Sequence, residues 1–189
     1  TSLNFTIDGN HMVSSGRDRV LILWDIKEGK AIRTLPVYEC VEDSVILPIK
    51  FQLPGIKVKK SDGGIFVASA GEKGVIKVWD ILSSKLIYTQ TNSFVTPAND
   101  GNLAITQLLL NEVRCCLSVI SSDHNIIIYN LSNFECSRQM VGFTDEILDI
   151  SYFGKDDTHI AVATNSIDIK VYDLSTMNCQ LVKGHGDLV

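Results

Sequence analysis

Four copies of one short pattern constrain the fold of this 189-residue chain more than any other feature. Each copy leaves a turn, alternates apolar and polar residues, and ends in an aromatic residue, then Asp or Asn, then an aliphatic residue. The copies end at Trp24-Asp25-Ile26, Trp79-Asp80-Ile81, Tyr129-Asn130-Leu131 and Tyr172-Asp173-Leu174. The aromatic residues are spaced by 55, 50 and 43 residues. Repetition at such an interval indicates a repeat protein, so single residues must be interpreted within their repeat.

Short strands separated by turn residues fill each repeat. In the first, candidate strands at 3–6, 11–14, 20–24 and 30–35 are separated by Gly, Asp and Asn residues. Four such strands predict an antiparallel meander, and a period of roughly 40–50 residues is typical of propeller blades. The sequence therefore predicts an all-β chain of four four-stranded antiparallel blades. Their approximate ranges are 1–40, 41–95, 100–141 and 142–183, and residues 184–189 begin a following blade.

Composition sets broad bounds on function. The chain has 45% hydrophobic and 21% charged residues, as a globular protein does. Its net charge of −5 argues against a general nucleic-acid binder, which usually carries a basic face. The sequence has no signal peptide and no apolar run that could span a bilayer, so we expect a soluble intracellular chain without membrane contact. Five Cys without a C-x-x-C pair and four scattered His predict neither a disulfide framework nor a metal site.

The repeats resemble the WD-repeat β-propeller family, whose units carry Gly-His, then a tight-turn Asp, then Trp-Asp. In that family the turn Asp lies six residues before the Trp. Asp18 and Asp123 hold this position relative to Trp24 and Tyr129. The repeat positions that match are Asp18, Trp24, Asp25, Trp79, Asp80, Asp123, Tyr129, Asn130, Tyr172, Asp173, Gly184 and His185.

The second and fourth units depart from the family pattern. Lys73 and Ser166 replace the turn Asp, and Phe143 replaces the His of the fourth unit. The family's His, Ser or Thr, Asp and Trp form a buried hydrogen-bond network, which is favourable only when every member is satisfied. The resemblance implies that the carboxylates of Asp18 and Asp123 lie near the inner strands and accept hydrogen bonds from backbone N–H groups. It also implies that the four aromatic residues lie on third strands and pack between sheets.

The same residues do not indicate an enzyme. A hydrolase triad needs an exposed nucleophile, a His in contact with it and a carboxylate behind the His. Here Asp, His and Ser recur at blade turns, and no phosphate-binding loop or nucleophile elbow is present. We therefore expect no catalytic residue and no cofactor. One local basic cluster, Lys57, Lys59 and Lys60, is either a solvated loop tip or a contact for RNA or an acidic partner.

Irregular features extend the resemblance to one nucleolar branch of the family. They include Pro36, which directly follows Ile-Arg-Thr-Leu in the first unit, and Phe143 in place of the His. They also include Asn165-Ser166 in place of the turn Asp of the fourth unit. This resemblance implies a non-catalytic scaffold of the small-subunit processome, acting in pre-rRNA processing and ribosome biogenesis in the nucleus and nucleolus. Its partners would be WD-repeat and other processome proteins, with indirect or weak contact to pre-rRNA or small nucleolar RNA. The alternative is an adaptor or substrate receptor in a ubiquitin ligase or signalling complex.

Closure of the ring is the last expectation. Members of the family usually have seven blades, for which four repeats supply little more than half a ring. Packing between blades buries sheet faces, so the outer faces of the first and fourth units would expose apolar strands. We expect an open arc whose free faces pack on a second copy or on the rest of a longer chain.

Overall fold

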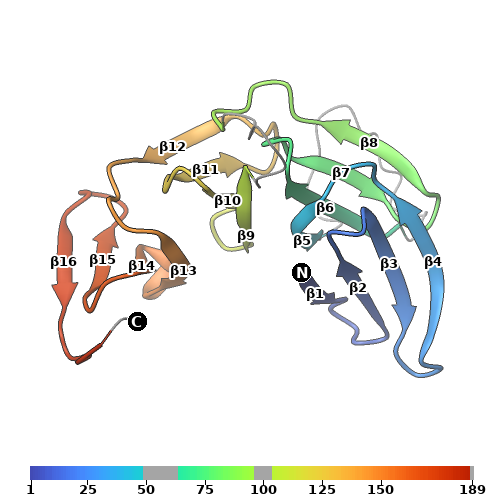
Figure 1. The fold of residues 1–189 in the computed structure, drawn as a ribbon, viewed down its shortest axis with the longest axis horizontal. Helices are drawn as coiled ribbons and strands as arrows, with labels where there is room; N and C mark the ends of the chain where they lie inside the picture. The colour runs from blue at the N-terminus through green and yellow to red at the C-terminus, as the bar shows by residue number, and fades with distance from the viewer. Residues whose placement is uncertain (49–63, 96–103, 188–189) are drawn as a thin grey trace.

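The computed structural model describes residues 1–48, 64–95 and 104–187, and within them the chain is all-β. Sixteen strands form four antiparallel sheets of four strands each. The sheets stand around an arc as propeller blades, with their first strands toward the concave side (Figure 1). This arrangement confirms the predicted fold class.

Each blade is a meander in which consecutive strands pair. Blade 1 contains β1 (Ser2–Phe5), β2 (His11–Ser15), β3 (Val20–Asp25) and β4 (Lys30–Pro36). Blade 2 contains β5 (Val41–Leu47), β6 (Phe66–Gly71), β7 (Lys77–Asp80) and β8 (Lys85–Thr89). Blade 3 contains β9 (Ile105–Asn111), β10 (Cys116–Ser121), β11 (Ile126–Asn130) and β12 (Cys136–Met140). Blade 4 contains β13 (Ile147–Phe153), the 3-10 turn η1 (Lys155–Asp157), β14 (His159–Thr164), β15 (Ile169–Asp173) and β16 (Cys179–Val182).

The hydrophobic core is divided among the three seams between neighbouring blades. Residues of blades 1 and 2 form one buried cluster, those of blades 2 and 3 a second, and those of blades 3 and 4 a third. Leu21 and Leu23 of β3, for example, pack against Val67 of β6 across the first seam. Successive side chains of a strand point to opposite faces of the sheet. A blade that lies between two others must therefore carry apolar side chains on both of its faces.

The chain crosses from blade 1 to blade 2 in close contact with the end of β6. A Cβ atom on Gly71 would lie only 2.2 Å from the carbonyl oxygen of Cys40. Only glycine therefore fits at this crossing without a backbone shift.

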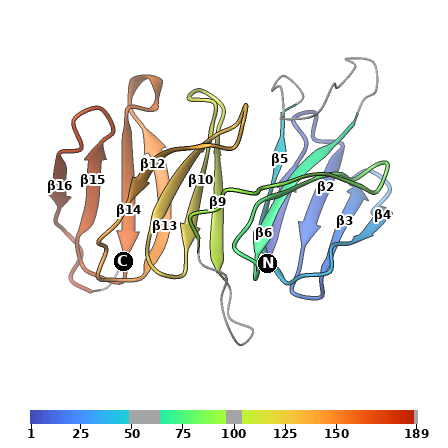
Figure 2. The ribbon, with the colours of Figure 1, turned by 90° about the horizontal axis from the view of Figure 1, so that it is seen from above.

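The ends of the arc do not meet. Blades 1 and 4 lie at its two extremes, and Figure 2 shows the same row of blades from above. The contacts between blades join blade 1 to blade 2, blade 2 to blade 3, and blade 3 to blade 4. The four blades thus form an open arc, as expected, and do not close into a four-bladed ring.

Candidate interaction surfaces

All four aromatic residues of the repeat lie on the third strand of a blade, as predicted. They are Trp24 on β3, Trp79 on β7, Tyr129 on β11 and Tyr172 on β15. Trp79, Tyr129 and Tyr172 pack in the seam toward the preceding blade. Trp24 faces the other way from the first seam, on the free face of blade 1, and is half-buried. The prediction of packing between sheets is therefore confirmed for three of the four and wrong for Trp24 in this arc.

Both Trp side chains are anchored within their own blade. Trp24 Nε1 donates to Ser14 Oγ at 2.9 Å, and Trp79 Nε1 donates to Ser69 Oγ at 3.0 Å. Each Ser lies ten residues before its Trp, on the second strand. The indole N–H of each Trp, buried at Trp79 and half-buried at Trp24, thus has a hydrogen-bond acceptor within its own blade.

The two blades with Tyr at this position lack that Ser. Val119 and Val162 stand ten residues before Tyr129 and Tyr172 and offer no acceptor. The Tyr129 hydroxyl instead accepts a hydrogen bond from Phe94 N at 3.3 Å. Burial raises the pKa of Tyr172 to about 12, so its hydroxyl stays protonated at neutral pH. The aromatic and the second-strand residue therefore change together.

The residue after each aromatic caps the turn between the third and fourth strands. Its side-chain oxygen accepts from backbone N–H groups two or three residues later. These bonds run from Glu28 N to Asp25 (2.8 Å), from Leu82 N to Asp80 (3.2 Å), from Ser132 N to Asn130 (2.8 Å) and from Ser175 N to Asp173 (2.7 Å). Hydrogen bonds from the Ser175 hydroxyl and N–H lower the pKa of Asp173 to about 2. These four side chains therefore stabilise the turns between the third and fourth strands.

The prediction for the tight-turn carboxylates is wrong. Asp18 and Asp123 are both exposed, and no described backbone N–H donates to either carboxylate. Asp18 Oδ1 lies beside the Cα atom of Gly16, where a side chain at that position would stand. Asp123 accepts a hydrogen bond from the Ser121 hydroxyl. Burial of a carboxylate is favourable only where hydrogen bonds replace the water that it loses. No described backbone N–H group does so at either position, and both carboxylates stay in water.

Blades 2 and 4, which lack the turn Asp, carry an ion pair that sequence reasoning missed. A Lys two residues before the aromatic faces an acid in the linker that precedes the blade. Lys77 Nζ lies 2.5 Å from Glu39 Oε1, with the side chains 12% and 1% exposed. Glu39 Oε2 has no hydrogen-bond partner among the described residues, so the contact is a close ion pair without further support. Lys170 Nζ lies 3.8 Å from Asp145 Oδ2 in a more exposed setting.

The same two blades share a polar residue on the inner strand. Asp43 of β5 accepts from Leu108 N of blade 3 at 2.7 Å, and Asp149 of β13 accepts from Gln107 Nε2 at 2.9 Å. Burial raises the pKa of Asp43 above its ordinary value, although backbone N–H groups of Leu108 and Ser44 oppose the shift. These bonds join neighbouring blades beside the concave side of the arc. Asp149 stands between Leu148 and Ile150, and this polar residue in an apolar strand is a signal that could have revealed its contact. Asp43 stands between Glu42 and Ser44 and gives no such signal.

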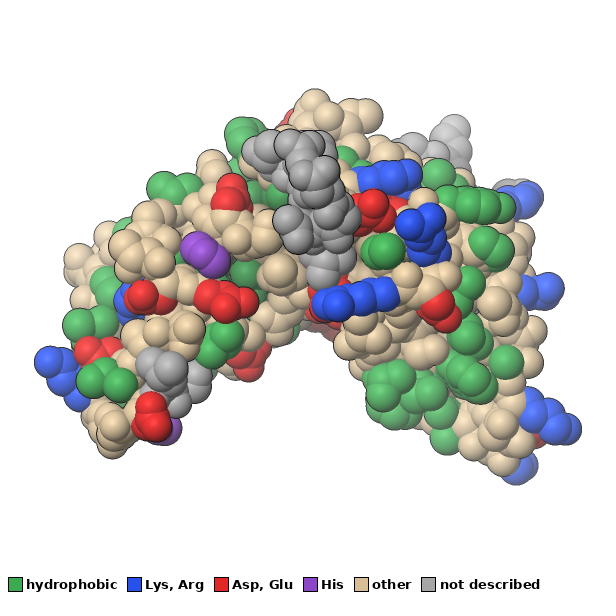
Figure 3. Space-filling model, in the orientation of Figure 1, with side chains coloured by type: hydrophobic (Ala, Val, Ile, Leu, Met, Phe, Trp, Pro, Cys, Tyr) green, Lys and Arg blue, Asp and Glu red, His purple; other side chains and the backbone are tan. Residues whose placement is uncertain are grey.

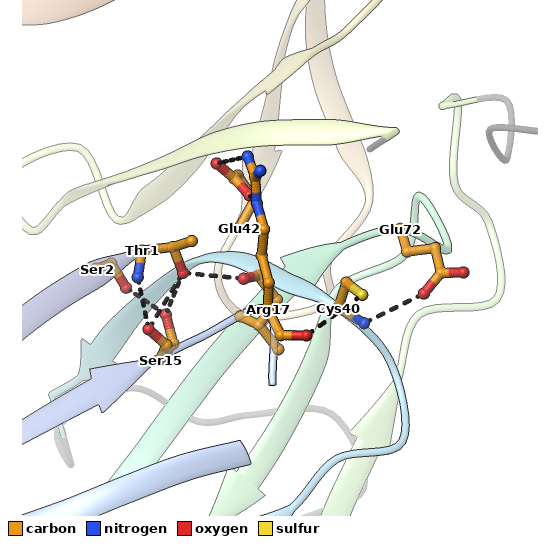
Figure 4. A network of polar contacts seen from close by, with 8 residues as sticks. Thr1, Ser2, Ser15, Arg17, Cys40, Glu42 and Glu72 are labelled. Carbon is orange, nitrogen blue, oxygen red and sulfur yellow. Dashed lines mark hydrogen bonds and ion pairs between the residues drawn. The ribbon is translucent and has the colours of Figure 1, made fainter. Parts of the chain in front are cut away.

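A further set of polar contacts joins blade 1 to blade 2. Arg17 forms a two-pronged ion pair with Glu42, at 2.9 and 3.0 Å, and Glu72 accepts from Cys40 N at 3.2 Å (Figure 4). The Thr1 hydroxyl donates to the carbonyl of Val41 at 2.9 Å. The first seam is therefore fixed by directional bonds as well as by apolar packing.

The free face of blade 1 is the largest apolar surface in view. Hydrophobic side chains gather over β1, β2 and β3 at the lower right of Figure 3. Strand register places these residues on one face: Leu3, Phe5, Met12, Ile22 and Trp24. Contiguous apolar surface of this kind marks an interaction site.

A groove on the side of the turns between first and second strands is a second candidate. It has a volume of about 470 Å³ and is lined mainly by apolar residues, among them Ile7, Ile46 and Pro48. Asp8 lies at its rim, and hydrogen bonds from Thr6 and Asn10 lower the pKa of Asp8 to about 2. The groove therefore combines apolar walls with a fixed negative charge.

The other sequence-predicted positions contribute less. Gly184 and His185 are exposed. Lys57, Lys59 and Lys60 lie outside the described residues. Within the described ranges, no group of three or more His, Cys, Asp or Glu could hold a metal ion. No helix there has the length and hydropathy needed to cross a membrane.

Comparison with known proteins gives concordant results. A family model described as "WD domain, G-beta repeat" matches residues 1–25. The whole chain is 36% identical to transducin beta-like protein 3 of Rattus norvegicus, 37% to that of Mus musculus and 35% to that of Homo sapiens. The chain spans less than a quarter of these relatives, 22% or 23% of their length. A structure titled "Structure of U3-55K" superposes with a TM-score of 0.71 at 16% identity, over 99% of this chain and 52% of that one, and so shares its fold.

Proposed function

We propose, from the premise that this chain is a WD-repeat β-propeller arc, that it acts as a non-catalytic scaffold for protein assembly in ribosome biogenesis. More specifically, we place it in the nucleolar small-subunit processome, where it would support pre-rRNA processing. Its partners would be other WD-repeat and processome proteins, and any contact with pre-rRNA or small nucleolar RNA would be indirect or weak.

One observation carries the proposal: the similarity to transducin beta-like protein 3 extends over the whole chain at 35–37% identity. The same fold occurs in another protein at only 16% identity, so the propeller by itself does not require such similarity. Rigid antiparallel blades hold loops on two sides of the arc, and loops on a rigid scaffold are where binding resides. The net charge of −5 supports protein partners over direct RNA binding.

Affinity purification of the intact protein from growing cells tests this function. We expect processome proteins, precursor rRNA and a small nucleolar RNA to co-purify, and a fluorescent fusion to concentrate in the nucleolus. Nuclease treatment should remove the RNA and leave the protein partners bound. Recovery of ubiquitin-ligase or signalling subunits in their place would reject the proposal and favour the adaptor alternative.

We further propose that the free faces of blades 1 and 4 are covered in the intact protein, by further blades of a seven-bladed ring or by a second copy. The exposed apolar side chains of blade 1 support this proposal. Light scattering on the intact protein distinguishes the two, because a closed ring is monomeric and paired arcs are dimeric.

A further inference from the structure

The seam between blades 3 and 4 holds a small polar pocket with two arginines in its wall. The pocket has a volume of about 250 Å³, and both Arg114 and Arg138 line it. Asn130 completes the polar rim, while the buried Leu174 of blade 4 contributes apolar surface. The pocket is thus lined chiefly by polar and positively charged groups, unlike the groove on blades 1 and 2.

Local structure directs both arginines to this seam. Arg138 pairs in register with Ile128, which is buried in the cluster shared with blade 4, so both side chains lie on that face of the sheet. Arg114 belongs to the β9–β10 turn, where its N–H donates to Asn111 Oδ1 at 2.8 Å. The backbone next to it is left-handed at Cys115, with φ of 51°.

Neither guanidinium finds a strong acceptor in the described chain. Arg114 Nη1 lies 3.5 Å from the carbonyl oxygen of Asp157, and Arg138 Nη1 contacts the sulfur of Met177. A guanidinium carries five N–H donors, and a thioether is a weak acceptor. Among the described residues, no carboxylate forms an ion pair with either arginine, whereas Arg17 has Glu42. Most of their donor groups are therefore available to an anion.

We propose that this pocket binds a phosphate monoester carried by a partner protein, as phosphoserine or phosphothreonine. A phosphate monoester carries nearly two negative charges at neutral pH and several acceptor oxygens, which match two guanidinium groups. The small volume admits one terminal group. A phosphodiester with a sugar on each side does not fit as well, and the net charge of −5 opposes an extended RNA contact. This inference does not depend on the proposed role in ribosome biogenesis.

The test uses the intact protein and a fluorescein-labelled peptide, Ala-Gly-phosphoserine-Gly-Ala, with its serine twin as reference. Fluorescence anisotropy should detect binding of the phosphopeptide and not of the twin. R114Q or R138Q should each weaken binding about tenfold, the effect of losing one charge-assisted contact. The double variant should abolish it. R138K keeps the charge but loses the planar fork, and should fall between the wild type and R138Q.

Arg33 provides a matched control. It pairs with Leu23 in blade 1 as Arg138 pairs with Ile128 in blade 3, but no arginine lies in the neighbouring β1–β2 turn. R33Q should bind the phosphopeptide within about twofold of the wild type. Thermal unfolding midpoints should be unchanged in all variants, since neither pocket arginine is buried.

Four outcomes would overturn the proposal. The first is no phosphopeptide binding, and the second is equal binding of the serine twin. The third is equal loss of binding in R33Q and in the pocket variants. The fourth is a single-stranded RNA that binds more tightly than the phosphopeptide and loses affinity in the double variant, which would assign the pocket to nucleic acid.

Discussion

Trp24 and Trp79 occupy the same place in two repeats but differ in what covers them. Each lies on a third strand and donates to a Ser on the second strand, at 2.9 and 3.0 Å. Blade 1 covers Trp79, which is 6% exposed, whereas Trp24 faces no blade in this arc and is half-buried. The contacts within the blade are matched, so the pair isolates what packing between blades contributes.

The same contrast appears along whole strands. β6 of blade 2 and β10 of blade 3 are buried at every position, whereas β14 of blade 4 alternates between buried and half-buried residues. A blade with two neighbours hides both faces, and a blade at the end of the arc hides one. Burial in this protein is therefore set by a blade's position in the arc as much as by its sequence.

The largest expected effect is the loss of a covered aromatic residue. Trp79→Ala should lower the free energy of unfolding by about 3–5 kcal/mol, because it removes a buried ring and leaves a cavity in the first seam. Denaturant unfolding followed by circular dichroism measures the change. A cost below about 1 kcal/mol would contradict the packing of Trp79 in the seam.

A second effect compares the two Lys–acid pairs. Lys77→Met leaves the Glu39 carboxylate buried without a partner and should cost about 3 kcal/mol. Lys170→Met removes the longer, more exposed pair and should cost less than about 1 kcal/mol. The double variant with Lys77→Met and Glu39→Leu should recover most of the loss, because it removes the buried charge as well. Equal costs for the two Lys variants would contradict the difference in burial.

Much of this fold could be predicted from the sequence, because its signals are local. The tight turns and the alternation around Trp24 and Trp79 place strands without reference to the rest of the chain. The capping role of Asp80 lies within a few residues of its partner Leu82. Features of this kind do not depend on how the blades pack against one another.

The features that sequence reasoning missed join distant residues. Glu39, in the linker before blade 2, meets Lys77 at the start of β7, 38 residues later in the chain. Asp43 meets Leu108 only across the seam between blades 2 and 3. The burial of Asp18 was predicted wrongly because it depended on a hydrogen-bond network that the described residues do not form around this carboxylate. The arginine pocket likewise depends on a turn and a strand of blade 3 that come together beside blade 4.

A smaller effect concerns Asp43, the half-buried carboxylate at the seam between blades 2 and 3. Asp43→Asn should cost about 1–2 kcal/mol at neutral pH, because one of two backbone N–H groups loses a charged acceptor. Burial raises the pKa of Asp43, so the folded state holds its proton to higher pH than the unfolded state. The wild type should therefore gain stability relative to the variant as pH falls through that raised pKa toward the ordinary value of 3.8. Urea unfolding at several pH values measures the difference in unfolding free energy between the wild type and Asp43→Asn. A difference that becomes smaller as the pH falls would contradict desolvation as the main cause of the raised pKa of Asp43.

The smallest effect is expected at Trp24 in this 189-residue arc. Trp24→Ala removes a half-buried ring and the hydrogen bond to Ser14 but no contact between blades, so it should cost about 1 kcal/mol. The difference from Trp79→Ala then measures the packing between blades. In the intact protein, a neighbouring blade over this face would raise the cost of Trp24→Ala toward that of Trp79→Ala. If unfolding experiments on the intact protein give the same small cost as on the arc, the free face of blade 1 is not covered by a blade, and the proposed ring fails at this end.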